Sequence, residues 1–209
     1  GPPVHLPADM GTVDDLDLVA DSLVVYSARP GERKDPTDGL YLVEPQSGRL
    51  VRSFFRPYLS PTVADLARVA GWIKSSVRGD TIASLFAPCD TIFLHSIHGV
   101  ALQRIPLPTK AFHLVDRPRQ PGERLAEWTA RLSFASDIFW LPNGDFLVLF
   151  SEFEHNLPRR HLLALTRGGE LLFQIVDSPR LHAVLPGGAI LFSSPTELAT
   201  NQLVVARRR

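Results

Sequence analysis

Carboxylate, imidazole and guanidinium side chains gather near the end of one apolar segment. The stretch DIFWLPNGDFLVLFSEFEH ends with Glu152, Glu154 and His155, and Arg159, Arg160 and His161 follow within six residues. Carboxylate and imidazole groups are ligands that zinc and manganese accept. Side chains alternate along a strand, however, so Glu152 and Glu154 would share one face and His155 would lie on the other. Neither an HxH nor an HExxH motif is present. We therefore expect ligand contacts, and no metal site, at Glu152, Glu154, His155 and Arg159.

A second group of candidate residues lies in the arginine-rich segment LVDRPRQPGERLAEWTARLS. Arg117, Arg119 and Arg124 could form a guanidinium cluster there. Such a cluster suits a carboxylate or phosphate ligand, because guanidinium presents a planar fork of donors. The alternative is an insert that packs over the fold and binds nothing.

Recognisable catalytic motifs are absent. The sequence contains no GxSxG elbow, no P-loop and no GxGxxG, which are the patterns of common nucleophile and nucleotide sites. Cys89 is the single cysteine, so no intrachain disulfide can form. It has no histidine close by in sequence and is interpreted as incidental. The catalytic residues, if there are any, remain unassigned.

The elements that must position these residues form a repeat of two hairpins. A short strand, a turn rich in Gly, Asp, Asn or Pro, and an apolar strand occur in four copies, around Ala20, Gly79, Asn143 and Gly187. A second hairpin follows the first three copies, with the turns Ser47-Gly48, His98-Gly99 and Gly168-Gly169. Gly and Asn tolerate the positive φ of tight hairpin turns, and the Val, Leu, Ile and Phe of the flanking runs favour strands. The repeating unit is therefore four antiparallel strands.

Repeated four-stranded units predict an all-β fold, a β-propeller in which neighbouring blades bury each other's faces. About four blades are expected, at residues 13–57, 73–108, 132–177 and 180–209 of a single domain. Residues 1–8 would supply an outer strand of a preceding or closing blade. Short helices are predicted between blades, within residues 61–74 and 123–131, where the apolar residues have helical spacing.

Three segments carry the resemblance to a known family: DDLDLVADSLVVYS with GLYLVEPQSGRLVRSFF, the arginine-rich insert, and DIFWLPNGDFLVLFSEFE. Together they resemble exported bacterial six-bladed propellers of the TolB-like/NHL-like kind. The resemblance implies a six-bladed ring of which this chain forms part, and a periplasmic or secreted location. A closed four-bladed ring is the alternative. Unpaired blade edges in a partial ring would invite self-association.

Function is expected on one end of the blades. The turns within each hairpin are tight, whereas the loops between the two hairpins and between blades carry every insertion, and long loops on a rigid scaffold are where binding groups gather. We therefore predict a non-enzymatic binding or scaffold propeller that docks a protein, a peptide or a small ligand on this long-loop face, with no cofactor.

The alternative is a propeller hydrolase of the lactonase kind, or a lyase, with a metal in the central channel. The lactonase resemblance implies calcium held by acidic ligands, with zinc a further possibility. Asp14, Asp15, Asp17 and Asp137 point that way, but the second and fourth blades offer no acid at the matching positions.

Composition limits the partners. Acidic and basic residues balance at 22 each, which argues against a nucleic-acid partner held by net charge. No apolar run approaches the roughly 20 residues of a membrane-spanning helix.

Overall fold

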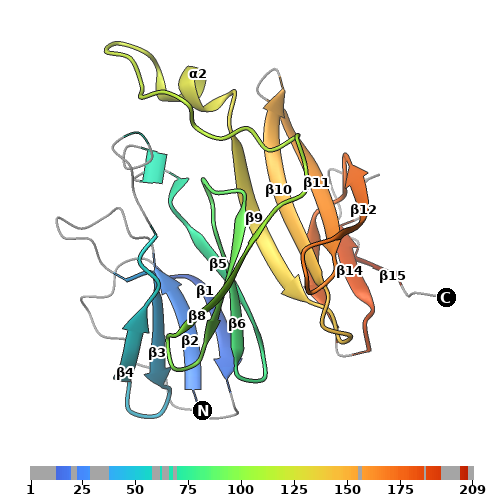
Figure 1. The fold of residues 1–209 in the computed structure, drawn as a ribbon. Coiled ribbons are helices and arrows are strands. Elements are labelled where there is room, and N and C mark those ends of the chain that lie inside the picture. The colour runs from blue at the N-terminus through green and yellow to red at the C-terminus, as the bar shows by residue number, and fades with distance from the viewer. Residues whose placement is uncertain are drawn as a thin grey trace.

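The computed structural model describes residues 13–19, 23–28, 38–57, 62, 66–67, 70–154, 157–185, 187–193 and 203–206. Within them the chain forms four antiparallel sheets arranged side by side as blades, which confirms the all-β propeller prediction (Figure 1). No helix in these residues is long and apolar enough to cross a membrane.

Each sheet is a simple meander whose strands follow chain order. The first blade contains β1 (Val13–Val19), β2 (Leu23–Ala28), β3 (Leu40–Glu44) and β4 (Arg49–Phe54). The second contains β5 (Ile73–Arg78), β6 (Thr81–Phe86), β7 (Thr91–Ser96) and β8 (Ala101–Pro106). The third contains β9 (Ser133–Trp140), β10 (Phe146–Glu154), β11 (Leu157–Leu165) and β12 (Leu171–Val176). The fourth is described as three strands, β13 (Leu181–Val184), β14 (Ile190–Ser193) and β15 (Leu203–Ala206).

The tight turns form where glycine permits them. In the β9–β10 turn Gly144 has a φ of 92°, a left-handed conformation that side chains disfavour. Leu141 and Asp145 close this turn with a 2.8 Å backbone hydrogen bond. A Cβ added at Gly144 would lie 2.7 Å from Arg78 Nη1 of the second blade, so glycine also permits close contact between blades.

The first strands of successive blades lie next to one another, β1 beside β5, β5 beside β9, and β9 beside β13. The core lies between the blades. Leu40 and Leu42 pack with Ile73 and Ile82 between the first two blades. The largest cluster joins the second and third blades and includes Leu85, Trp140 and Phe150. Phe139, Leu147 and Leu149 of the third blade form a cluster with Leu181 of the fourth.

Specific polar contacts fix the blades against each other. Trp140 Nε1 donates to the carbonyl of Ser76 at 3.0 Å, and Arg78 donates to the carbonyl of Pro142 at 3.1 Å. Arg52 of β4 donates to the carbonyl of His98 in the β7–β8 turn at 2.8 Å. Apolar burial, together with these hydrogen bonds between blades, makes the blades a rigid scaffold for side chains at their ends.

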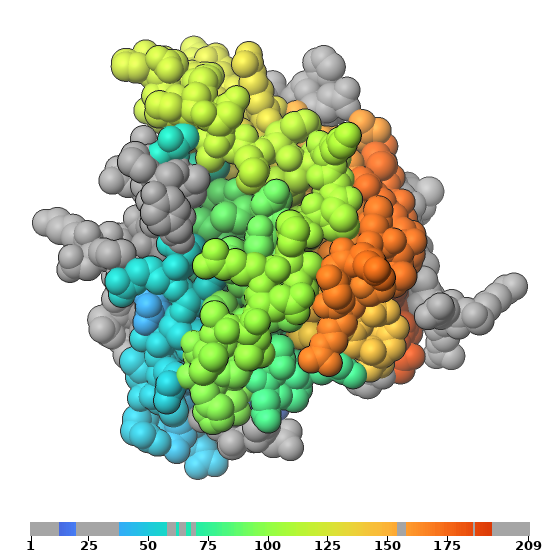
Figure 2. Space-filling model, viewed as in Figure 1, coloured from blue at the N-terminus to red at the C-terminus, as the bar shows by residue number. Residues whose placement is uncertain are grey.

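The insertions lie where the sequence placed them, with one correction. The segment between β8 and β9 carries a short helix, α2 (Leu125–Thr129), as predicted. It lies at the same end of the blades as the C-terminal end of β10 (Figure 1), and this part of the insert protrudes at that end in the space-filling view (Figure 2). The expected loop over 154–160 is wrong, because Glu154 pairs with Leu157 and Phe153 with Pro158 in one long hairpin. The predicted strand at residues 1–8 lies outside the described residues. In the segment 61–74, where a short helix was predicted, residues 62, 66, 67 and 70 are helical and Ile73 begins β5, while six residues lie outside the description.

Candidate functional site

Acidic side chains of β1 lie against the start of β5, the first strand of the second blade. Asp15 Oδ2 accepts the backbone N–H of Ser75 at 3.0 Å, and its Oδ1 lies 4.0 Å from Lys74 Nζ. Lys74 Nζ also donates to the carbonyl of Asp14 at 2.8 Å. The first strands of the first and second blades are therefore joined by interactions of carboxylate and ammonium groups.

Two carboxyl groups beside Lys74 resist ionisation. Burial, with smaller effects from the charges of Asp15 and Asp137, raises the pKa of Asp17 to about 7. Burial raises the pKa of Asp137 to about 6, against the opposing effect of Lys74. Asp17 Oδ2 is buried and has no hydrogen-bond partner among the described residues. Perturbed carboxyl groups of this kind are concentrated at functional sites.

A polar pocket of about 250 Å³ opens beside these groups, between the third and fourth blades. Its lining comprises Lys74, Ser136, Asp137, Leu149, Ser151, Arg160, Arg180 and Leu181. Ser151 and Arg160 are paired residues near the ends of β10 and β11, so the pocket lies towards the long-loop face. Three cationic groups face one carboxyl group in this lining, and the described residues provide no ion pair for Arg160 or Arg180.

The sequence suggested Asp14, Asp15, Asp17 and Asp137 as possible ligands of a metal ion. In the part of the chain that the structure describes, no three His, Cys, Asp or Glu side chains are close enough together to hold one. Lys74 lies among these acids, so its ammonium group already supplies the positive charge that a metal ion would bring. The pocket lining, with three cationic groups and one carboxyl group, suits an anionic ligand better than a cation.

Two of the residues predicted from the sequence, Glu152 and Arg159, come together in the third blade. They are direct cross-strand partners, with Arg159 Nη1 at 3.9 Å from Glu152 Oε1. Arg159 Nε is also 3.1 Å from Asp177 Oδ1 on the neighbouring connection. The other carboxylate oxygen of Glu152 lies 3.7 Å from His113 Nδ1 of the insert. Glu152 thus joins the insert to the long-loop end of the blade.

His161, which the sequence placed only among possible metal ligands, completes this cluster. Its ring is buried and stacks on Phe150 with the centroids 4.5 Å apart and the planes 2° from parallel. The side-chain amide of Gln174 donates to Nδ1 at 3.1 Å, so Nε2–H donates to Glu152 Oε1 at 2.9 Å. The polar atoms of His161 are all satisfied, as a structural residue requires.

The arginine-rich insert is held together by its own side chains. Arg117 and Glu123 form a two-fold contact of 2.9 and 2.7 Å. Hydrogen bonds from Arg117 and from the Gln120 N–H lower the pKa of Glu123 to about 2. Trp128 anchors the insert in a cluster with Leu66 and Phe134. Arg117 therefore stabilises the insert and is not free for a ligand.

The remaining predicted site residues are Arg119, Arg124, Glu154 and His155. Arg119 and Arg124 are exposed on the insert and have no hydrogen bond or ion pair of their side chains within the described residues. The side chain of Glu154 and all of His155 lie outside what the structure describes. A shared ligand of Arg117, Arg119 and Arg124 therefore stays a prediction.

Cys89 lies between β6 and β7 and is partly buried. Burial, with a smaller effect of Asp90, raises the pKa of its thiol to about 11 from an ordinary 9.0. At pH 8 this leaves about 100-fold less thiolate than in an exposed cysteine, and thiolate is the reactive form. We expect 5,5′-dithiobis(2-nitrobenzoate) to react with folded protein about 100-fold more slowly than with a short cysteine peptide. The peptide rate should return in guanidinium, and equal rates before and after unfolding would exclude the burial effect.

Comparison with known proteins supports the fold and leaves the activity open. No family model matches the sequence, and no curated protein matches it. A solved member of the DUF4221 family from Bacteroides vulgatus is similar over 90% of this chain and 60% of its own, with a TM-score of 0.56 and 9% identity. This chain thus spans about 60% of that protein's length, and at such low identity the likeness shows a shared propeller-like fold alone.

Weaker structural likenesses are found to two further proteins. A protein of unknown function from Bacteroides caccae has a TM-score of 0.45 and 10% identity over 88% of this chain and 57% of its own. AztD from Citrobacter koseri has a TM-score of 0.33 and 14% identity over 93% of this chain and 55% of its own. Neither likeness is strong enough to carry an inference about a ligand.

Proposed function

We propose that this chain is a non-enzymatic binding propeller that holds a small anionic ligand on its long-loop face. The pocket between the third and fourth blades is the single observation that carries the proposal. It brings Lys74, Arg160 and Arg180 around one carboxyl group, with the hydroxyls of Ser136 and Ser151 as further donors. Guanidinium and ammonium groups with neighbouring hydroxyls recognise carboxylates and phosphates.

The size of the pocket limits the ligand. At about 250 Å³ it lies just below the range of drug-sized sites. A dicarboxylate or a phosphate monoester matches this volume and the charge of the lining. A peptide or protein that presents such a group on an exposed side chain would use the same contacts.

The test is a titration of full-length protein with inorganic phosphate and with succinate, followed by thermal unfolding and calorimetry. Bound ligand raises the melting temperature by mass action. Arg160→Gln and Arg180→Gln should each weaken the affinity about 10-fold or more, because each removes a charge-assisted hydrogen bond. Arg167→Gln is the matched control, since this exposed arginine lies in the β11–β12 turn. The proposal fails if neither anion binds, or if all three variants behave alike.

A hydrolase or lyase is the second candidate, and Asp137 is the observation that favours it. A pocket carboxyl with a pKa of about 6 exchanges its proton near neutral pH, as a general acid or base must. The version with a channel metal predicts that calcium or zinc raises the melting temperature, and that Asp137→Asn abolishes this rise. Anion binding that is unaffected by either ion favours the binding module and a site without a cofactor.

We also infer that the site belongs to a larger ring, of six blades. Leu16 and Leu18 of β1 are 56% and 59% exposed. No large apolar side chain of β5, β9 or β13, the first strands of the later blades, is among the exposed ones. An apolar face of this kind is buried by another blade in a complete ring, or by a second copy of the chain.

A further inference from the structure

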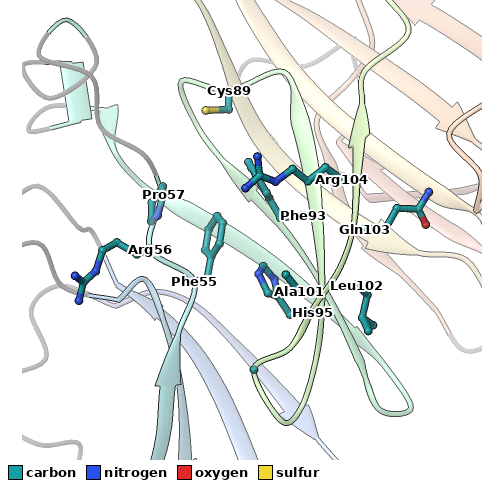
Figure 3. A pocket seen from close by; sticks show the side chains of 11 residues that line it. Phe55, Arg56, Pro57, Cys89, Phe93, His95, Ala101, Leu102, Gln103 and Arg104 are labelled. Atoms are coloured by element: carbon teal, nitrogen blue, oxygen red, sulfur yellow. The ribbon is translucent and has the colours of Figure 1, made fainter.

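A groove separate from the anion pocket of the third and fourth blades lies between the outer strands of the first two blades (Figure 3). Its volume is about 630 Å³. Phe55, just after β4, lines one side, and residues of β7 and β8 line the other. This volume lies within the range of pockets that bind small molecules.

Aromatic rings form the floor of this groove. Phe55 lies 4.9 Å from the ring of Phe93 and 5.1 Å from that of His95, measured between centroids. Phe55 has a φ of 63°, which is unusual for any residue with a side chain. Surrounding contacts must maintain such a conformation, and strained residues are concentrated at binding sites. In this case it directs the ring of Phe55 against Phe93 and His95.

One positive charge faces the floor. The guanidinium of Arg104 lies 5.8 Å from the ring centroid of Phe93. The lining contains no carboxylate, and Arg104 has no ion pair within the described residues. Arg56 also lines the groove, but it pairs with Asp38 at 3.7 Å and its side chain points away from Arg104 (Figure 3). Arg104 is therefore the group that a ligand's negative charge would meet.

His95 adds a polar group that lacks a partner. The residue is 7% exposed, and its Nδ1 has no hydrogen-bond partner in the described part of the chain. Burial, with a smaller effect of Arg104, lowers the pKa of His95, so the ring is neutral at pH 7. Buried polar atoms are nearly always hydrogen-bonded in folded proteins. His95 Nδ1 therefore adds a hydrogen-bonding group beside the aromatic rings of the groove.

We propose that this groove binds a small aromatic carboxylate, whose ring stacks on Phe55 and Phe93 and whose carboxylate pairs with Arg104. Arginine above an aromatic ring suits a planar anion, because it donates two parallel hydrogen bonds while the ring contacts the ligand's flat face. The site is independent of the anion pocket proposed above. The two sites lie at different blade interfaces and share no lining residue.

The test compares three probes of one shape: 2-naphthoate, the neutral 2-naphthylmethanol and the cationic 2-naphthylmethylammonium. Calorimetry on the full chain should show the order naphthoate, alcohol, ammonium, from tightest to weakest. Bound naphthoate should also slow the alkylation of Cys89 by N-ethylmaleimide, because this thiol lines the groove. Equal affinities for the three probes would overturn the proposal.

Variants assign the binding to the groove. Arg104→Gln should weaken naphthoate about 10-fold and leave the alcohol unchanged, because it removes charge and keeps the apolar floor. Phe93→Leu should weaken naphthoate and the alcohol together, and circular dichroism checks that it folds. Arg167→Gln and Arg160→Gln should change neither. If Arg160→Gln weakens naphthoate binding as much as Arg104→Gln does, the probe binds in the anion pocket and the groove proposal is wrong.

Discussion

Replacing Phe150 with alanine is expected to lower the free energy of unfolding by about 3 to 5 kcal/mol, the range for a fully buried aromatic residue. Phe150 has no exposed surface and belongs to the cluster between the second and third blades. One side of its ring stacks on His161, and Phe112 of the insert lies 5.3 Å away. Alanine would leave a cavity at the point where two blades and the insert meet. Chemical denaturation followed by tryptophan fluorescence measures the loss.

Phe173→Ala is the matched control. Phe173 lies on the outer strand of the same blade and is 48% exposed, so its truncation should cost less than about 1 kcal/mol. Equal losses in the two variants would mean that the third blade is not packed as described. Phe150→Ala should also disturb the hydrogen bond between His161 and Glu152. The reason is that the ring of His161 is held in place by stacking on Phe150.

The blade architecture could be predicted because its determinants are local in sequence. The glycine turns recur after apolar runs, and each turn joins strands that are neighbours in the same sheet. Phe139, Leu147 and Leu149 were assigned to blade packing from alternation alone, since β9 and β10 each place every second residue on one face. The helix after Arg124 was also evident from its apolar spacing.

The functional geometry was less accessible because it depends on pairing register. The sequence grouped Glu152 with both His155 and His161, and only the structure shows that His161, on the facing strand, is its hydrogen-bond partner. The register follows from a hairpin connection of two residues, and the sequence suggested a longer loop. Pro158 lies inside β11, although proline is uncommon inside strands. It is tolerated in this hairpin opposite Phe153.

Sites between blades could not be read from the sequence at all. Phe55 and Arg104 belong to different blades, and nothing in their local sequence indicates that they line one groove. The channel acids gave a partial signal, since Asp15, Asp17 and Asp137 were noted as a group. The ammonium of Lys74 among them was missed, because it comes from the intervening blade. That lysine changes the expected ligand from a cation to an anion.

Asp17→Asn is expected to stabilise the protein at pH 8 by about 2 to 4 kcal/mol and to have little effect at pH 4. The pKa of Asp17 is raised from 3.8 to about 7 in the folded protein. Between these two values the folded state binds the proton and the unfolded state releases it. The contribution of this group to stability is therefore complete below about pH 4 and is lost as the pH rises to about 7.

Asparagine keeps the shape of the side chain and cannot ionise, so it removes this pH dependence. Urea denaturation at pH 4, 6 and 8 measures the difference between variant and wild type, which cancels the titration of all other groups. Asp80→Asn, at an exposed turn of the second blade, is the control and should give a difference that is small and independent of pH. A gain from Asp17→Asn that is the same at pH 4 and pH 8 would contradict a buried neutral carboxyl. A gain that grows with pH would mean that the chain keeps an acid beside its channel at a cost in stability, which is the pattern of a residue retained for function.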